Sequence, residues 1–126
     1  MQETGGDRVD KILGAASALG VSLICPPEVI SALCRRRREK SLSARQYAAV
    51  KNALAEDIAD AEVIQLTDRV IARAVELLEA WPLRSADALH LACAVEWRAD
   101  WFVSADERQC TAAHGCGLHV ERLTAE

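Results

Sequence analysis

Short apolar runs that alternate with helical segments are the feature that most limits the fold of this chain. The runs are rich in strand-forming residues and read VSLIC (21–25), EVIQL (62–66), WFVS (101–104) and LHVERL (118–123). One or two helical segments separate each run from the next, which is the order that produces parallel strands covered by helices. The sequence therefore predicts an α/β fold with a short, mainly parallel sheet, and we expect a single domain over residues 1–126.

The helical segments carry apolar residues at three- and four-residue spacing, and capping or breaking residues bound them. Pro26 and Pro27 end the first strand and are tolerated in the first turn of a helix. Ser43, Thr67 and Ser85 are placed to begin later helices. The predicted helices cover residues 7–19, 28–40, 43–61, 68–81, 85–99 and 106–114.

Composition excludes several classes of protein. With 51% hydrophobic and 27% charged residues the chain is not disordered. No run reaches the roughly 18 apolar residues that span a bilayer, and the start MQETGGDR lacks the features of a secretory signal. Five cysteines without a CxxC pair favour a reduced, cytoplasmic protein. The net charge of −4 means that any contact with nucleic acid would be local.

Three carboxylates fall at the starts of predicted helices. Glu28 follows the first strand and its two prolines, Asp87 opens the helix before strand 101–104, and Asp106 follows that strand by two residues. In a parallel α/β sheet the helix N-termini lie at the edge where the strands end, and ligands bind at that edge. We therefore expect Glu28, Asp87 and Asp106 to project toward one edge of the sheet.

Two interpretations of these acids stay open. Each acid by itself fits a helix cap, because a first-turn carboxylate complements the helix dipole and free N–H groups, for about 0.3–1 kcal/mol. If the three converge, their mutual repulsion favours a bound cation, and all-oxygen ligands suit Mg²⁺ or Mn²⁺. Such a metal lowers the pKa of a bound water and holds phosphate oxygens, as phosphodiester hydrolysis requires.

The segment RSADALHLACAVEWRADWFVSADERQ (84–109) resembles the C-terminal half of PIN domains, which are small α/β metal-dependent nucleases. Many of them are the toxin ribonucleases of bacterial VapBC-type toxin–antitoxin pairs. The family pattern is a helix with Asp-Ala-Leu-His-Leu-Ala, then Ala-Asp, a short apolar strand and Ser/Thr-x-Asp. Residues 87–92, 99–100, 101–103 and 104–106 match it in order and spacing. Glu28 lies where such proteins place a glutamate on their second helix.

The resemblance implies a metal-dependent endoribonuclease that an antitoxin holds in check. Carried over by residue, Glu28, Asp87 and Asp106 would be ligands of Mg²⁺ or Mn²⁺, and the hydroxyl of Ser104 would orient a ligand or water close to the metal. It also implies an RNA substrate, an antitoxin partner and a homodimer. A catalytically inactive PIN-fold interaction module is the alternative.

The family pattern also contains an element that this sequence lacks. PIN domains begin with an apolar strand that ends in an Asp, and this strand is central in their sheet. The segment MQETGGDRVDKILG has no such strand, and Asp7 and Asp10 lie in or before a helix. We expect the fold to close the gap, to borrow a strand or to oligomerise over it. Two explanations stay open, a start codon further upstream or a reduced member of the family with impaired activity.

The run of arginines from Arg35 to Arg38 is the one concentrated basic site, with Lys40 close behind. Cations at this position complement the C-terminus of a helix, and they can also contact RNA phosphates. Arg35 and Arg36, about two turns from Glu28, are the better placed for RNA, although the same helix could instead meet an antitoxin. His90, three residues after Asp87, is expected to pack in the core or to bond to a neighbour.

Overall fold

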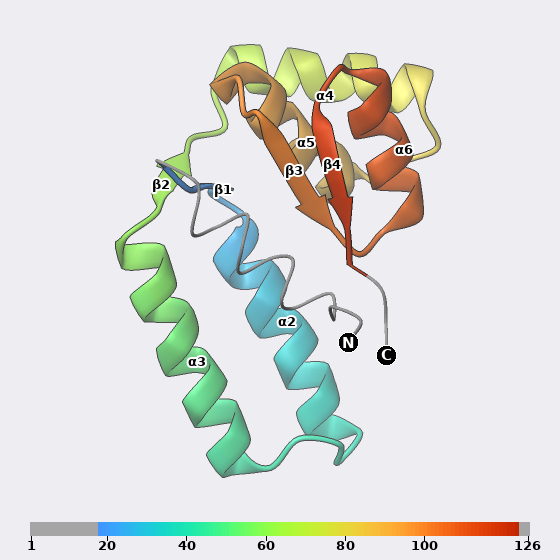
Figure 1. The fold of residues 1–126 in the computed structure, drawn as a ribbon. Coiled ribbons are helices and arrows are strands. Elements are labelled where there is room, and N and C mark those ends of the chain that lie inside the picture. The colour runs from blue at the N-terminus through green and yellow to red at the C-terminus, as the bar shows by residue number, and fades with distance from the viewer. Residues whose placement is uncertain (1–17, 124–126) are drawn as a thin grey trace, which may run out of the picture.

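A computed structural model of the chain describes residues 18–123, and Figure 1 shows how their elements are arranged. The alternation of strands and helices is confirmed; the helix predicted at 7–19 lies almost entirely outside the described residues. The elements are β1 (Gly20–Ser22), α2 (Cys25–Arg38), α3 (Ala44–Ala59), β2 (Glu62–Ile64), α4 (Asp68–Ala80), α5 (Ser85–Trp97), β3 (Trp101–Ser104), α6 (Glu107–Gly115) and β4 (His119–Arg122).

The strands are parallel, as predicted, but the described part of the chain divides them between two sheets of two strands each. In one sheet β1 pairs with β2, with Val21 beside Val63; in the other β3 pairs with β4, with Phe102 beside Val120. A continuous sheet would need a strand that pairs with β1 and β3 together, and none of the described strands does so. The expectation of one sheet is corrected in this respect, because each pair uses only one edge of β1 and of β3.

The first strand is shorter than the apolar run 21–25 suggests. Helix α2 begins at Cys25 with Pro26 and Pro27 in its first turn, and Ile24 occupies the N-cap position. The chain must turn before the two prolines enter the helix, so β1 ends at Ser22. This short turn brings Glu28, in the first turn of α2, close to the carboxyl end of β1.

Helix α5 lies directly against β1. A Cβ atom at Gly20 would come within 2.7 Å of Ile64 Cδ1 and 2.8 Å of Trp97 Cζ3, so a larger residue would force these side chains to move. The indole Nε1 of Trp97 also donates a hydrogen bond to Glu62 Oε2 at 2.8 Å. These contacts hold the beginning of the β1–β2 sheet against the end of α5.

The hydrophobic core lies where α4, α5 and α6 meet. Small residues on α5 and α6, among them Ala88, Ala92, Ala112 and Ala113, are completely buried and let the helices approach closely. Leu91 is the largest fully buried side chain. Phe102 and Val120 pack against this core from the β3–β4 sheet, so α5 contacts both sheets.

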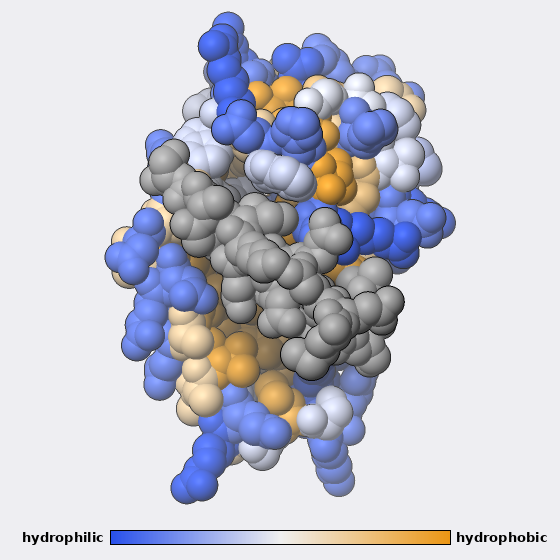
Figure 2. All heavy atoms as spheres, in the orientation of Figure 1, coloured by the Kyte–Doolittle hydropathy of each residue, from blue (hydrophilic) through white to orange (hydrophobic). Residues whose placement is uncertain are grey.

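Helices α2 and α3 form a pair that extends away from this core (Figure 1). Leu33 is the one buried residue of α2, and no residue of α3 is buried. Figure 2 shows hydrophobic side chains in the furrow between the two helices and hydrophilic ones at the tip where α2 ends and α3 begins. The pair therefore keeps apolar surface exposed.

Capping groups set several helix starts. Ser43 Oγ accepts a hydrogen bond from Gln46 N at 3.1 Å, and Ser43 N donates to Gln46 Oε1 at 2.8 Å, which is a capping box as the position of Ser43 predicts. Helix α5 begins at Ser85 as predicted, but Arg84 occupies its N-cap position and makes no side-chain hydrogen bond there. Among the described helices, none is long and apolar enough to cross a membrane.

Candidate functional site

The three acids lie at helix starts, as the sequence predicts. Glu28 is in the first turn of α2, Asp87 is in the first turn of α5, and Asp106 is the N-cap residue of α6. Glu28 and Asp106 are exposed, whereas Asp87 is half-buried. β1 leads into the helix that carries Glu28, and β3 leads into the helix that Asp106 caps.

A hydrogen bond between distant residues joins two of these elements. Ser22 Oγ and His90 Nδ1 lie 2.7 Å apart, and the tautomer of the imidazole decides which atom donates. Ser22 is 4% exposed and ends β1, while His90 lies one turn after Asp87 on α5. The bond therefore attaches the beginning of α5 to the carboxyl end of β1.

The carboxylates of Glu28 and Asp87, which lie on two different helices, both act on the pKa of His90. Burial lowers the pKa of the His90 imidazole below its ordinary value, and the carboxylates of Glu28 and Asp87 act against this by raising the pKa. Both acids are thus close enough to influence one imidazole, although they lie on different helices.

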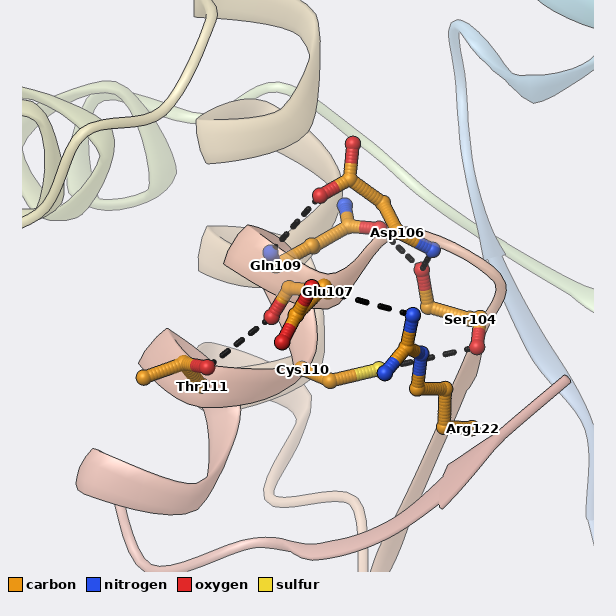
Figure 3. A network of polar contacts seen from close by, with 7 residues as sticks. All are labelled: Ser104, Asp106, Glu107, Gln109, Cys110, Thr111 and Arg122. Carbon is orange, nitrogen blue, oxygen red and sulfur yellow. Dashed lines mark hydrogen bonds and ion pairs between the residues drawn. The ribbon is translucent and has the colours of Figure 1, made fainter. Parts of the chain in front are cut away.

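Asp106 belongs to a second network, which Figure 3 shows from close by. Its backbone N–H donates to Ser104 Oγ at 3.0 Å, and its Oδ1 accepts from Gln109 N at 3.0 Å. The hydroxyl of Ser104 donates to Gln109 Oε1 at 2.6 Å. The other oxygen of the Asp106 carboxylate points away from the six other residues drawn in Figure 3. Asp106 is therefore a helix cap through one oxygen only.

Gln109 connects this second network to α5. Its Nε2 donates to the backbone oxygen of Asp87 at 3.1 Å, and the residue is 7% exposed. The first turn of α5 is thus joined to β1 through His90 and to the start of α6 through Gln109.

The acids have the chemistry of ligands for a hard divalent cation, but they do not form a closed centre. Within residues 18–123, no three His, Cys, Asp or Glu side chains lie close enough together to hold a metal ion. The structure attaches the helix of Asp87 to the end of β1 through His90, and Gln109 joins Asp106 to the backbone of Asp87. Shared metal ligation by the three acids stays a prediction, and so does a role of Ser104 beside a metal.

The two arginines predicted to contact RNA lie on the exposed end of α2. Arg35 and Arg36 are in its last turn. Two hydrogen bonds form at this end of the helix. The Arg36 backbone oxygen accepts from Ser41 Oγ at 3.2 Å, and the Arg37 side chain donates from Nη1 to Leu42 O at 3.4 Å. The contact of Arg35 and Arg36 with RNA stays a prediction.

Sequence reasoning did not identify Ser22 and Gln109, and it assigned His90 no role in the site. Gln109 had a recognisable signal, because Asp106 followed three residues later by Gln is the pattern of a helix start. Ser22 had none, since its partner lies 68 residues away. The expectation that His90 bonds to a neighbour is confirmed.

Comparison with known proteins gives a family match over most of the chain. The model of the PIN domain family matches residues 2–115. The chain is 32% identical over 120 residues to Ribonuclease VapC45 of Mycobacterium tuberculosis (strain CDC 1551 / Oshkosh), and the match covers 94% of this chain and 83% of that relative. The same identity and coverage hold for Ribonuclease VapC49 of Mycobacterium tuberculosis (strain ATCC 25618 / H37Rv).

Proposed function

Because the chain belongs to the PIN domain family, we propose that it is an endoribonuclease of the toxin–antitoxin type that depends on Mg²⁺ or Mn²⁺. The observation that carries the proposal is the hydrogen bond between Ser22 Oγ and His90 Nδ1, which attaches the helix of Asp87 to the strand that leads into the helix of Glu28. The names of the two relatives, both ribonucleases, support RNA as the substrate.

In this proposal Glu28 and Asp87 would hold the metal, and Asp106 would contribute the oxygen that points away from its own network. A bound Mg²⁺ or Mn²⁺ supplies a water of lowered pKa and a clamp on the phosphate oxygens. The hydroxyl of Ser104 keeps Asp106 in place, because it accepts the Asp106 N–H and donates to Gln109. Arg35 and Arg36 bind phosphates of the RNA from the end of α2.

Cleavage of a labelled RNA with Mn²⁺, together with calorimetry of Mn²⁺ binding, tests this function. We expect Glu28→Gln and Asp87→Asn to lower both the cleavage rate and the Mn²⁺ affinity by at least about tenfold, because each removes a ligand charge. Asp68→Asn is the matched control, since Asp68 is also an exposed first-turn acid, on α4. The proposal is wrong if Mn²⁺ neither binds nor stimulates cleavage by the wild-type chain.

One observation favours a second candidate, a PIN-fold interaction module without nuclease activity. Asp106 accepts the Gln109 N–H at 3.0 Å, so it already has the local role of a helix cap. The same calorimetry distinguishes the two candidates. If the acids are only caps, Asp87→Asn and Asp68→Asn lower stability to a similar extent, by about 0.3–1 kcal/mol, and neither changes a metal affinity.

We further propose a cytoplasmic protein that binds an antitoxin and pairs with a second copy of itself. All five cysteines are free, which agrees with a reducing compartment. The apolar furrow between α2 and α3 is the antitoxin surface in this proposal. Dimerisation uses an exposed apolar row on one side of α4, here called the α4 stripe, which comprises Ile71, Val75 and Leu78 with 43%, 50% and 39% of their surface exposed.

A further inference from the structure

The hydrogen bond between Ser22 and His90 joins the two elements that carry Glu28 and Asp87. β1 ends at Ser22 and leads through a short turn into the first turn of α2, where Glu28 lies. Asp87 and His90 are three residues apart on α5, so they lie on the same face of that helix. Fixing His90 against the end of β1 therefore also fixes Asp87 relative to Glu28.

Gln109 joins Asp87 and Asp106 in a similar way, because it makes a hydrogen bond to each of them. Its backbone N–H holds the carboxylate of Asp106, and its side-chain Nε2 holds the backbone oxygen of Asp87. Its side-chain oxygen is fixed in turn by Ser104 at 2.6 Å. Gln109 is almost completely buried, so these bonds are shielded from competing water.

The acids themselves have no such fixation to one another. Within residues 18–123, no hydrogen bond or ion pair joins the carboxylates of Glu28, Asp87 and Asp106 to each other. At close range these three charges would repel, so their separation has to come from neighbouring groups. Among the described residues, the side chains of His90 and Gln109 make hydrogen bonds that link α5 to β1 and to α6.

We propose that His90 and Gln109 are positioning residues, which set how far apart the acids of the site lie. His90 sets the separation of Glu28 and Asp87 through Ser22, and Gln109 sets that of Asp87 and Asp106. Neither touches the RNA or the metal in this scheme. Their role resembles that of outer-shell groups in metal sites, whose loss commonly weakens metal binding about 10- to 100-fold.

The inference rests on the proposed function for its metal readout, so a second readout without metal accompanies it. The backbone N–H of Glu28 donates to Ile24 O at 3.1 Å, and that of Ala88 donates to Arg84 O at 3.0 Å. These two amides report on the first turns of α2 and α5. Their hydrogen-exchange rates, measured by NMR in metal-free protein, report how often the hydrogen bonds of the two turns open.

Two substitutions at position 90 form a matched pair. Asparagine places a polar atom near the position of Nδ1 and can keep the bond to Ser22, whereas glutamine reaches toward the position of Nε2 and leaves Ser22 without its partner. We expect His90→Gln to speed exchange at Glu28 and Ala88 by about 3- to 10-fold, as the loss of one hydrogen bond does. It should also raise the Kd for Mn²⁺ about tenfold or more. His90→Asn should stay close to wild type in both.

Gln109→Met removes both side-chain hydrogen bonds and keeps a similar length. We expect it to weaken Mn²⁺ binding about tenfold or more and to speed exchange at Ala88, while the amide of Glu28 changes less because the bond between Ser22 and His90 is kept. The controls are His114→Gln, on the exposed end of α6, and Gln46→Met, in the capping box of α3. Both controls should leave Mn²⁺ binding unchanged.

The results separate the inference from the proposed function. If wild-type protein binds no Mn²⁺, the nuclease proposal fails, and the exchange data alone decide whether His90 and Gln109 hold the two turns. The inference is overturned if His90→Gln matches wild type in both readouts. It is also overturned if His90→Asn is as damaging as His90→Gln, because the effect then comes from lost packing and not from the bond to Ser22.

Discussion

Replacing Gly115 with alanine tests how tightly α6 packs against Trp81. A Cβ atom at Gly115 would clash with Trp81 Cζ2 and would lie 2.6 Å from Trp81 Cη2, and the third-nearest atom, at 3.5 Å, also belongs to Trp81. The indole must therefore move, and it packs against the buried core of α4, α5 and α6. Overpacking of this kind costs about 1–3 kcal/mol.

The higher helix propensity of alanine offsets part of that cost in stability. Alanine favours a helix over glycine by up to about 1 kcal/mol, and by less at a helix end, where Gly115 lies. We therefore expect Gly115→Ala to lower the free energy of unfolding by about 1–2 kcal/mol, measured by urea denaturation. Gly117→Ala is the control, because its φ of +87° strains alanine while no atom lies within 4 Å of the added Cβ.

A double-mutant cycle with Trp81→Leu identifies the cause. Leucine removes all three atoms that the Cβ at Gly115 would meet. In that background Gly115→Ala should cost nothing or stabilise slightly, whereas Gly117→Ala should cost the same in both backgrounds. An equal cost of Gly115→Ala with and without Trp81 would refute this account of the packing.

Two further predictions concern the pH dependence of stability and self-association. Because burial lowers the pKa of His90, its protonation is favoured in the unfolded chain, and stability is lost as the pH falls through the ordinary histidine range toward the lower folded pKa. Urea denaturation between pH 7.5 and pH 5 should therefore show wild type losing stability relative to His90→Asn; parallel curves for the two proteins would contradict this. In sedimentation experiments Val75→Glu, in the α4 stripe, should shift the dimer toward monomer at least about tenfold, and Val50→Glu on α3 should not. A wild-type chain that is monomeric at every concentration would rule out the dimer.

The fold was predictable to the extent that local signals encode it. Apolar runs and helical spacing gave the order of the elements, and Ser43 with Gln46 marked one helix start correctly. The N-cap of α5 was less predictable, because Arg84 caps it without a side-chain bond. The division of the strands into two sheets was also missed, since an apolar run shows that a strand forms but not which edges pair.

The candidate site was predictable only in its charged members. Glu28, Asp87 and Asp106 were recognisable because acids at helix starts have a local pattern and because the 84–109 segment resembles a known family. The residues that hold them were not, apart from the spacing of Asp106 and Gln109. No local sequence pattern around a serine at the end of a strand predicts that it will bond to an imidazole 68 residues away.

By itself the sequence determined the alternation of strands and helices, the placement of acids at helix starts and the family to which the chain belongs. These depend on neighbouring residues, through periodicity, capping and short motifs. Only the tertiary structure decided that Ser22 meets His90 and that Gln109 reaches the backbone of Asp87. Such contacts arise when α5 packs against β1 and α6, because packing brings together polar groups far apart in the chain, and once buried they must find partners.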